Sequence, residues 1–155
     1  MGGATALRVG HSDDRVKCTL THDPWLTPIH KEIFESKFNK FKCPLFLLNT
    51  YKFHAGIIKY DAPRCFAKLR DENSKVEDVV IKRAGHIHQN DSIVINAFEL
   101  DKEDKFPRTN CHLILQLHTW LWLSFLFRAG VYNCQEQVQI EEHIDELRAE
   151  FVVYN

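Results

Sequence analysis

The stretch Val131-Tyr132-Asn133-Cys134-Gln135-Glu136 determines how the rest of the chain is interpreted. Asn133 is a good N-cap residue, and Glu136, three positions later, can complete a capping box, so the stretch predicts the start of a helix. Cys134 then takes the first helical position, where the partial positive charge of the helix terminus favours the thiolate. Cys134 is therefore the predicted nucleophile. The alternative is a small buried apolar residue.

A base for this nucleophile is predicted at His54, within the β-rich run 45–60. Ala55 and Gly56 follow it, and a glycine leaves room for another backbone or a ligand to approach. A strand with His-small-Gly-Ile, and much later Asn-Cys at a helix start, resembles the H-box/NC family. That family includes lecithin:retinol acyltransferase-like lipid enzymes and the 2A proteins of parechovirus-like and kobuvirus-like picornaviruses.

The resemblance implies a permuted papain-like architecture in which Cys134 attacks an ester or amide carbonyl while His54 takes and returns the proton. The lipid enzymes of the family have a second histidine further along, which orients the first. Here Phe66 stands at that position, and its ring cannot hold an imidazole by a hydrogen bond. The third residue is therefore unassigned. The later His86 and His88 are candidates, and an extended segment would place both rings on one face.

The missing orienting residue favours a protein without catalysis, because a triad that loses this residue loses several orders of magnitude in rate. The resemblance to 2A proteins then implies a non-structural viral protein of the host-cell cytoplasm. Its implied role is in viral RNA replication, with viral RNA and host proteins as partners. One alternative is a Cys-His thiol acyltransferase or phospholipase acting on lipid esters. Another is a structural domain in which the two motifs match by accident.

Composition indicates a globular domain. The chain has 155 residues, of which 45% are hydrophobic and 26% charged, which excludes a disordered protein. Five cysteines form no CxxC pair, and this favours a reduced cytosolic setting. Cys111-His112 with His118 matches no zinc-finger spacing. We therefore expect no metal and no cofactor.

The charge is unevenly distributed along the chain. Residues 31–70 hold nine Lys/Arg against three Asp/Glu, whereas residues 71–155 hold eight against fifteen. The basic part would suit RNA or a membrane surface, and the alternative is a set of ordinary solvated lysines. The longest apolar run, Leu113 to Phe127, is interrupted by polar residues and is shorter than the roughly 20 residues of a membrane span. It predicts buried core and no transmembrane segment, with contact to a membrane surface as the alternative.

The hydrophobic pattern predicts an α+β fold, with an antiparallel sheet flanked by helices. Residues 1–24 show no clear period and predict a flexible arm, and residues 25–155 predict one domain. Residues 122–128 fit a helix or a strand, and residues 152–154 fit a frayed end or a short strand. Helices are expected from 27 to about 42, from about 110, and from 134, and strands within 45–60, 64–70, 79–84 and 92–98.

Overall fold

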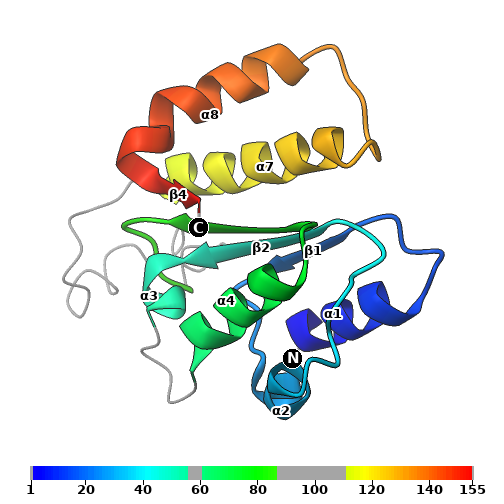
Figure 1. Ribbon diagram of the computed structural model, residues 1–155. Helices are drawn as coiled ribbons and strands as arrows, with labels where there is room; N and C mark the ends of the chain where they lie inside the picture. The colour runs from blue at the N-terminus through cyan, green and yellow to red at the C-terminus, as the bar shows by residue number, and fades with distance from the viewer. Residues whose placement is uncertain (1, 56–60, 87–110, 155) are drawn as a thin grey trace.

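The computed structural model describes residues 2–55, 61–86 and 111–154. Among these residues a four-stranded sheet is packed between helices on both faces (Figure 1). In chain order the elements are α1 (Gly2–Ser12), β1 (Thr19–His22), η1 (Thr27–Ile29), α2 (His30–Phe34), β2 (Leu45–Thr50), α3 (Tyr51–His54), α4 (Ala62–Glu72), β3 (Val76–Ile81), α7 (Cys111–Arg128), α8 (Gln137–Phe151) and β4 (Val152–Tyr154).

The sheet has the order β1-β2-β3-β4. The mixed α+β class is confirmed, but the expected antiparallel sheet is wrong for most of it. β1 pairs with β2 in parallel and β2 pairs with β3 in parallel, and only β3 with β4 is antiparallel. The physical reason lies in the connections between the strands. The β1–β2 and β2–β3 connections contain helices, and such long crossovers allow neighbouring strands to run parallel. Every residue of β2 is buried, as expected for a strand covered on both faces.

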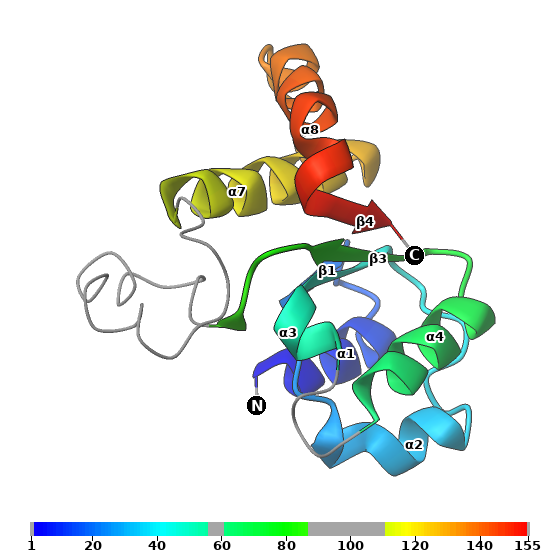
Figure 2. The same cartoon turned by 90° about the vertical axis from the view of Figure 1, so that its left-hand side faces the viewer.

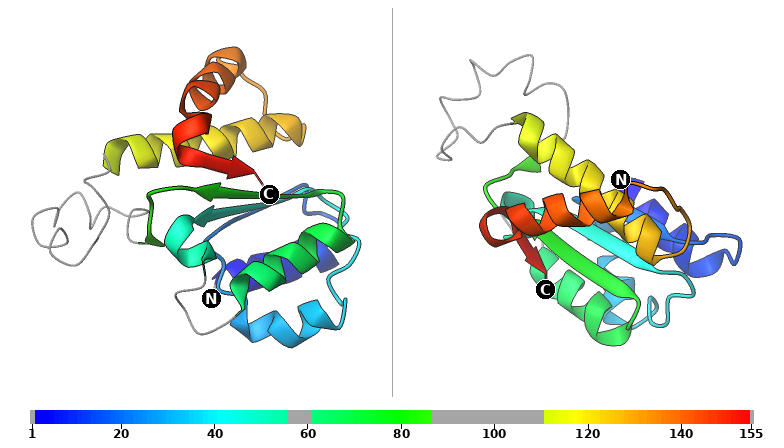
Figure 3. Two further views of the ribbon diagram at one scale, coloured as in Figure 1. Left: turned by 60° about the vertical axis from the view of Figure 1, so that its left-hand side comes forward. Right: turned by 90° about the horizontal axis from the view of Figure 1, so that it is seen from above.

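Two hydrophobic clusters lie on the two faces of the sheet. Leu45 and Leu47 of β2 point into a cluster with α1, α2 and α4, whereas Phe46 and Leu48 point into a cluster with α7 and α8. Figure 2 shows the two layers of helices on opposite sides of the sheet. Seen from above in Figure 3, α8 lies across α7. The period-2 alternation of the strand therefore joins two separate cores through β2.

The N-terminal residues are not a flexible arm. Gly2–Ser12 form α1, which buries Ala4 and Leu7, and Thr19–His22 form β1. The close packing of α1 on the sheet depends on Gly10, because a Cβ at this position would lie 1.9 Å from the Thr19 hydroxyl oxygen. The expectation was wrong because the buried face of this helix consists of Ala4, Leu7 and Gly10, and two of these residues are too small to mark a hydrophobic period.

Some of the other predicted helices and strands are confirmed, and others are wrong. The helix beginning at Thr27 ends at Phe34, earlier than expected. The segment expected to be a strand at 64–70 lies in α4, where Pro63 opens the helix and Cys65, Phe66 and Leu69 are buried at helical spacing. Residues 122–128, for which a helix and a strand were both predicted, form part of the helix α7. Residues 152–154, for which a frayed end and a strand were both predicted, form the strand β4. The expected strand 92–98 lies outside the described residues.

None of the helices in the part of the chain that the structure describes combines the length and the apolar character of a membrane span.

Candidate active site

His54, the predicted base, lies in the short helix α3, directly after β2, so the prediction of a strand at this residue is wrong. Its ring stacks on Phe66 with centroids 5.4 Å apart, and its Nε2 lies 3.5 Å from Oδ2 of Asp78. Asp78 is fully buried; it pairs with the guanidinium of Arg70 and accepts a hydrogen bond of 2.8 Å from Nδ2 of Asn49. His54 therefore stands beside a carboxylate that a permanent cation already neutralises.

Cys134, the predicted nucleophile, lies in the connection between α7 and α8. The helix α8 begins at Gln137 with Glu136 as its N-cap, so Cys134 precedes the helix and does not open it. Desolvation, together with a hydrogen bond to Glu136, raises the pKa of the Cys134 thiol. Cys134 therefore does not occupy the first helical position, from which a stabilised thiolate was predicted.

The structure does not bring His54 and Cys134 together. In Figure 1 α3 lies at the left end of the sheet, whereas the α7–α8 connection lies at the right, beyond the C-terminal end of α7. The arrangement that nucleophilic catalysis by this pair requires, a thiol within hydrogen-bond reach of the imidazole, is therefore not formed.

A different acid–histidine pair lies at the carboxyl edge of the parallel strands. Asp23 directly follows β1, and its side chain has no exposed surface. Its Oδ2 lies 3.0 Å from Nδ1 of His86. Thr50 donates its backbone N–H to Oδ1 at 2.6 Å and its hydroxyl to Oδ2 at 2.8 Å. The carboxylate is thereby bound at both oxygens, and one of them faces an imidazole.

Parallel strands explain why these residues meet. The carboxyl ends of β1, β2 and β3 lie at one edge of the sheet, so residues that directly follow the strands converge there. Asp23 follows β1, Thr50 is the last residue of β2, and His86 lies a few residues beyond β3. The Asp23 backbone N–H donates to the carbonyl of Leu48 at 2.9 Å. The His86 ring stacks on Phe53, with centroids 5.6 Å apart.

The electrostatics of the site depend on burial. Burial raises the pKa of Asp23, and hydrogen bonds from Thr50 and His86 partly oppose that rise. The neighbouring His22 is on the other side of the sheet, where its ring packs edge-on against His118 at 4.2 Å. Burial, followed by the proximity of His118 and His86, lowers the pKa of His22 to about 3. His22 is therefore neutral at physiological pH.

The first turn of α1 packs against the residue that follows Asp23. A Cβ added to Gly3 would lie 2.4 Å from Cβ of Pro24, so only glycine allows this approach. The free N–H groups in the first turn of a helix carry a partial positive charge. The structure therefore places a positive helix terminus beside the segment that carries Asp23.

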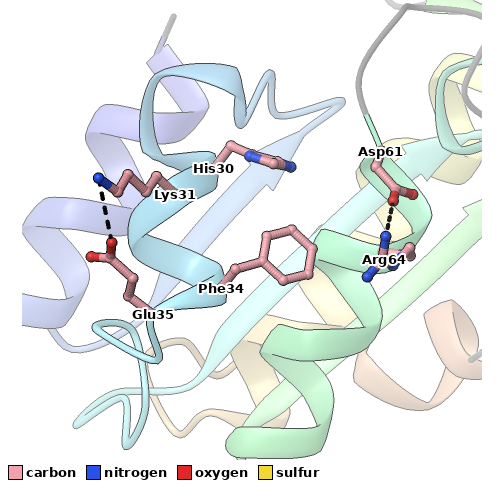
Figure 4. A pocket seen from close by; sticks show the side chains of 6 residues that line it. All are labelled: His30, Lys31, Phe34, Glu35, Asp61 and Arg64. Carbon is pink, nitrogen blue, oxygen red and sulfur yellow. Dashed lines mark hydrogen bonds and ion pairs between the residues drawn. The ribbon is translucent and has the colours of Figure 1, made fainter.

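A hollow of about 530 Å³ lies between α2 and the start of α4 (Figure 4). Lys31 pairs with Glu35 and Arg64 pairs with Asp61, and the Arg64 guanidinium also lies 5.3 Å from the centre of the Phe34 ring. These charges compensate one another, so the hollow presents mixed and balanced polarity. No group of three or more metal-ligating side chains occurs among the described residues.

One known protein family matches most of the chain. The family model of platelet-activating factor acetylhydrolase, isoform II, matches residues 1–144. The chain belongs to this family. The bovine platelet-activating factor acetylhydrolase is 31% identical to it over 91 residues, which are 57% of this chain and 18% of the bovine protein. The chain thus spans less than a fifth of the length of this relative.

Membership of the acetylhydrolase family supports the lipid-ester alternative of the sequence analysis more than the viral 2A interpretation. The predicted RNA and host partners and the cytoplasmic location are not tested by the comparisons and stay predictions. Asp23 was not predicted, although Thr-His-Asp-Pro after a short β-like run is typical of the end of a strand. His86 was predicted only as a possible orienting residue for His54, together with His88, which lies outside the described residues.

Proposed function

We propose that this chain supplies the acid and base of a lipid-ester hydrolase site, acting on the acetyl ester of platelet-activating factor or a similar lipid ester. The observation that carries the proposal is the 3.0 Å contact between Oδ2 of Asp23 and Nδ1 of His86. A carboxylate bound to Nδ1 fixes the tautomer of the imidazole and leaves Nε2 to exchange a proton with the reacting groups. Family membership supports the substrate class.

In this mechanism His86 accepts a proton through Nε2 from the attacking oxygen nucleophile, and then returns a proton to the leaving alcohol of the ester. Asp23 orients the ring and stabilises the imidazolium that forms in between. His86 is well placed for proton exchange because its side chain is 64% exposed, whereas that of Asp23 is not exposed at all. The N-terminus of α1 adds a positive potential that would stabilise developing negative charge.

The experiment compares four variants in an assay of acetate release from platelet-activating factor. Asp23→Asn and His86→Gln are expected to lose activity, whereas Cys134→Ser and His54→Gln keep it. Loss in Cys134→Ser with full activity in Asp23→Asn would contradict the proposal and favour the thiol enzyme. His88→Gln is assayed in parallel. If it alone among the histidine variants is inactive, the base is His88, and the role of Asp23 is unchanged.

A further inference from the structure

Among the described residues, Thr50, which is fully buried at the end of β2, gives the carboxylate of Asp23 two hydrogen bonds. Thr50 donates to both carboxylate oxygens, with the backbone N–H on Oδ1 and the hydroxyl on Oδ2. The second oxygen is the one that faces His86. Rotation of the carboxylate away from the imidazole would therefore break hydrogen bonds to Thr50 in a buried place, where unpaired polar groups are costly.

The backbone of Asp23 also needs this support. Its φ of 41° lies in the left-handed region, which residues other than glycine adopt at a cost. The hydrogen bond from the Asp23 N–H to Leu48 fixes the main chain to β2, and the two donors of Thr50 fix the side chain to the same strand. The register of β1 on β2, with His22 opposite Leu48, places Thr50 where it can reach the residue after β1.

We propose that Thr50 is a positioning residue of the esterase site, which holds the Asp23 carboxylate ionised and turned toward His86. The inference rests on the proposed function. A neutral hydroxyl suits this task, since a cation in its place would form an ion pair with Asp23 and compete with the imidazolium. Burial raises the pKa of Asp23, and the two hydrogen bonds from Thr50 are the largest causes that oppose the rise.

Thr50→Val tests the hydroxyl, because valine has nearly the same shape and keeps the backbone N–H. In the native protein we expect kcat for acetate release to fall about tenfold with an unchanged KM, since a hydrogen bond to a charged group is lost. Without this donor the Asp–His pair binds its proton more tightly, so the acid limb of the pH profile moves to higher pH. Thr50→Ser, which keeps the hydroxyl, is expected to restore both the rate and the pH profile.

A role confined to folding would give a different pattern. Thr50→Val would then lower the midpoint of thermal unfolding, but the folded enzyme would keep the wild-type pH profile, and that result overturns the inference. If Thr50→Val does not fold at all, Thr50→Ala replaces it, because alanine removes the hydroxyl without adding volume to the buried site.

A second readout needs no enzymatic activity. Carbon-13 NMR of the Asp23 carboxyl is expected to show a pKa raised further in Thr50→Val and unchanged in Thr50→Ser. If this shift occurs in a protein that releases no acetate, the proposed function fails and the positioning of Asp23 stands. If acetate is released but neither the pH profile nor the Asp23 titration moves in Thr50→Val, the inference fails and the function stands. If neither hydrolysis nor a shift is seen, both fail.

Discussion

Two buried aspartates lie on either side of the end of β2, and neighbouring residues of that strand bind them. Asn49 donates to Asp78 of β3, and Thr50 donates to Asp23 after β1. The partners on the far side differ. Asp78 pairs with the guanidinium of Arg70, whereas Asp23 faces the imidazole of His86.

This difference indicates that Asp78 stabilises the fold, whereas Asp23 can take part in proton transfer. Arginine is always charged, so its pair with Asp78 has no second protonation state to use. Histidine changes charge near neutral pH, so a carboxylate bound to its ring can support proton transfer. His54 is a histidine at the aspartate that arginine already occupies. A histidine that follows a strand therefore indicates a catalytic base only when the acid that binds its ring is known.

The largest effect is expected from Asp23→Asn. The variant should lower kcat by about 10⁴, because the amide no longer fixes the productive tautomer of His86. It should also unfold at a higher temperature at pH 7. Burial raises the pKa of Asp23, so the ionised carboxylate disfavours the folded state above that pKa, and a neutral amide removes the penalty. Acetate release and thermal unfolding measure the two effects. Retained activity would remove Asp23 from the mechanism.

The converse is expected for Asp78→Asn. Here the activity per folded molecule should be unchanged, while the free energy of unfolding falls by about 2–4 kcal/mol, because Arg70 loses its counter-charge in a largely buried place. Urea titration measures the loss. The double variant Asp78→Asn with Arg70→Leu is the control and should lose less than the single variant. An equal loss in both would mean that the ion pair does not explain the effect.

Acid should destabilise the fold through His22. Its pKa in the folded protein is about 3, whereas the ordinary pKa of a histidine is 6.5. The unfolded chain therefore takes up a proton below pH 6.5 that the folded chain does not, and the contribution to stability falls by about 3 kcal/mol between pH 7 and pH 4. Urea titration across this range measures the slope. His22→Phe should flatten it, and an equally steep slope in that variant would assign the effect to other groups.

A smaller effect is expected at the contact between α1 and the Asp23 segment. Gly3→Ala should cost about 1–3 kcal/mol and reduce acetate release, because the new Cβ would displace Pro24 and the residue before it. Gly2→Ala is the matched control, since nothing lies within 4 Å of its added Cβ. Equal stability and activity in the two variants would show that the segment yields without moving the carboxylate.

Much of the fold can be predicted from local pattern. The apolar run beginning at Leu45 gives β2, and the run near Val79 gives β3, because such runs fit a pleated, buried surface. The spacing of Ile140, Ile144 and Leu147 gives α8. The direction of the strands cannot be predicted in this way, since a run of buried residues reads the same in a parallel and an antiparallel pair.

The site could be predicted less well, and for a physical reason. Asp23 and His86 are far apart in the sequence and meet only because parallel strands bring their carboxyl ends to one edge. Asp23 was not predicted because residues 1–24 were expected to be a flexible arm and because the strands were expected to be antiparallel. The Asn-Cys motif failed differently: the cap was expected at Asn133, but the helix begins three residues after Cys134, and propensity alone fixes helix ends poorly.

The short strand β4 has a consequence for association. A strand at the rim of a sheet presents unpaired N–H and C=O groups that invite another chain to add on. β4 covers Val79, Val80 and Ile81 of β3 through an antiparallel ladder of three residue pairs. The backbone groups of these three residues of β3 are therefore paired within the chain and are not free to pair with another molecule.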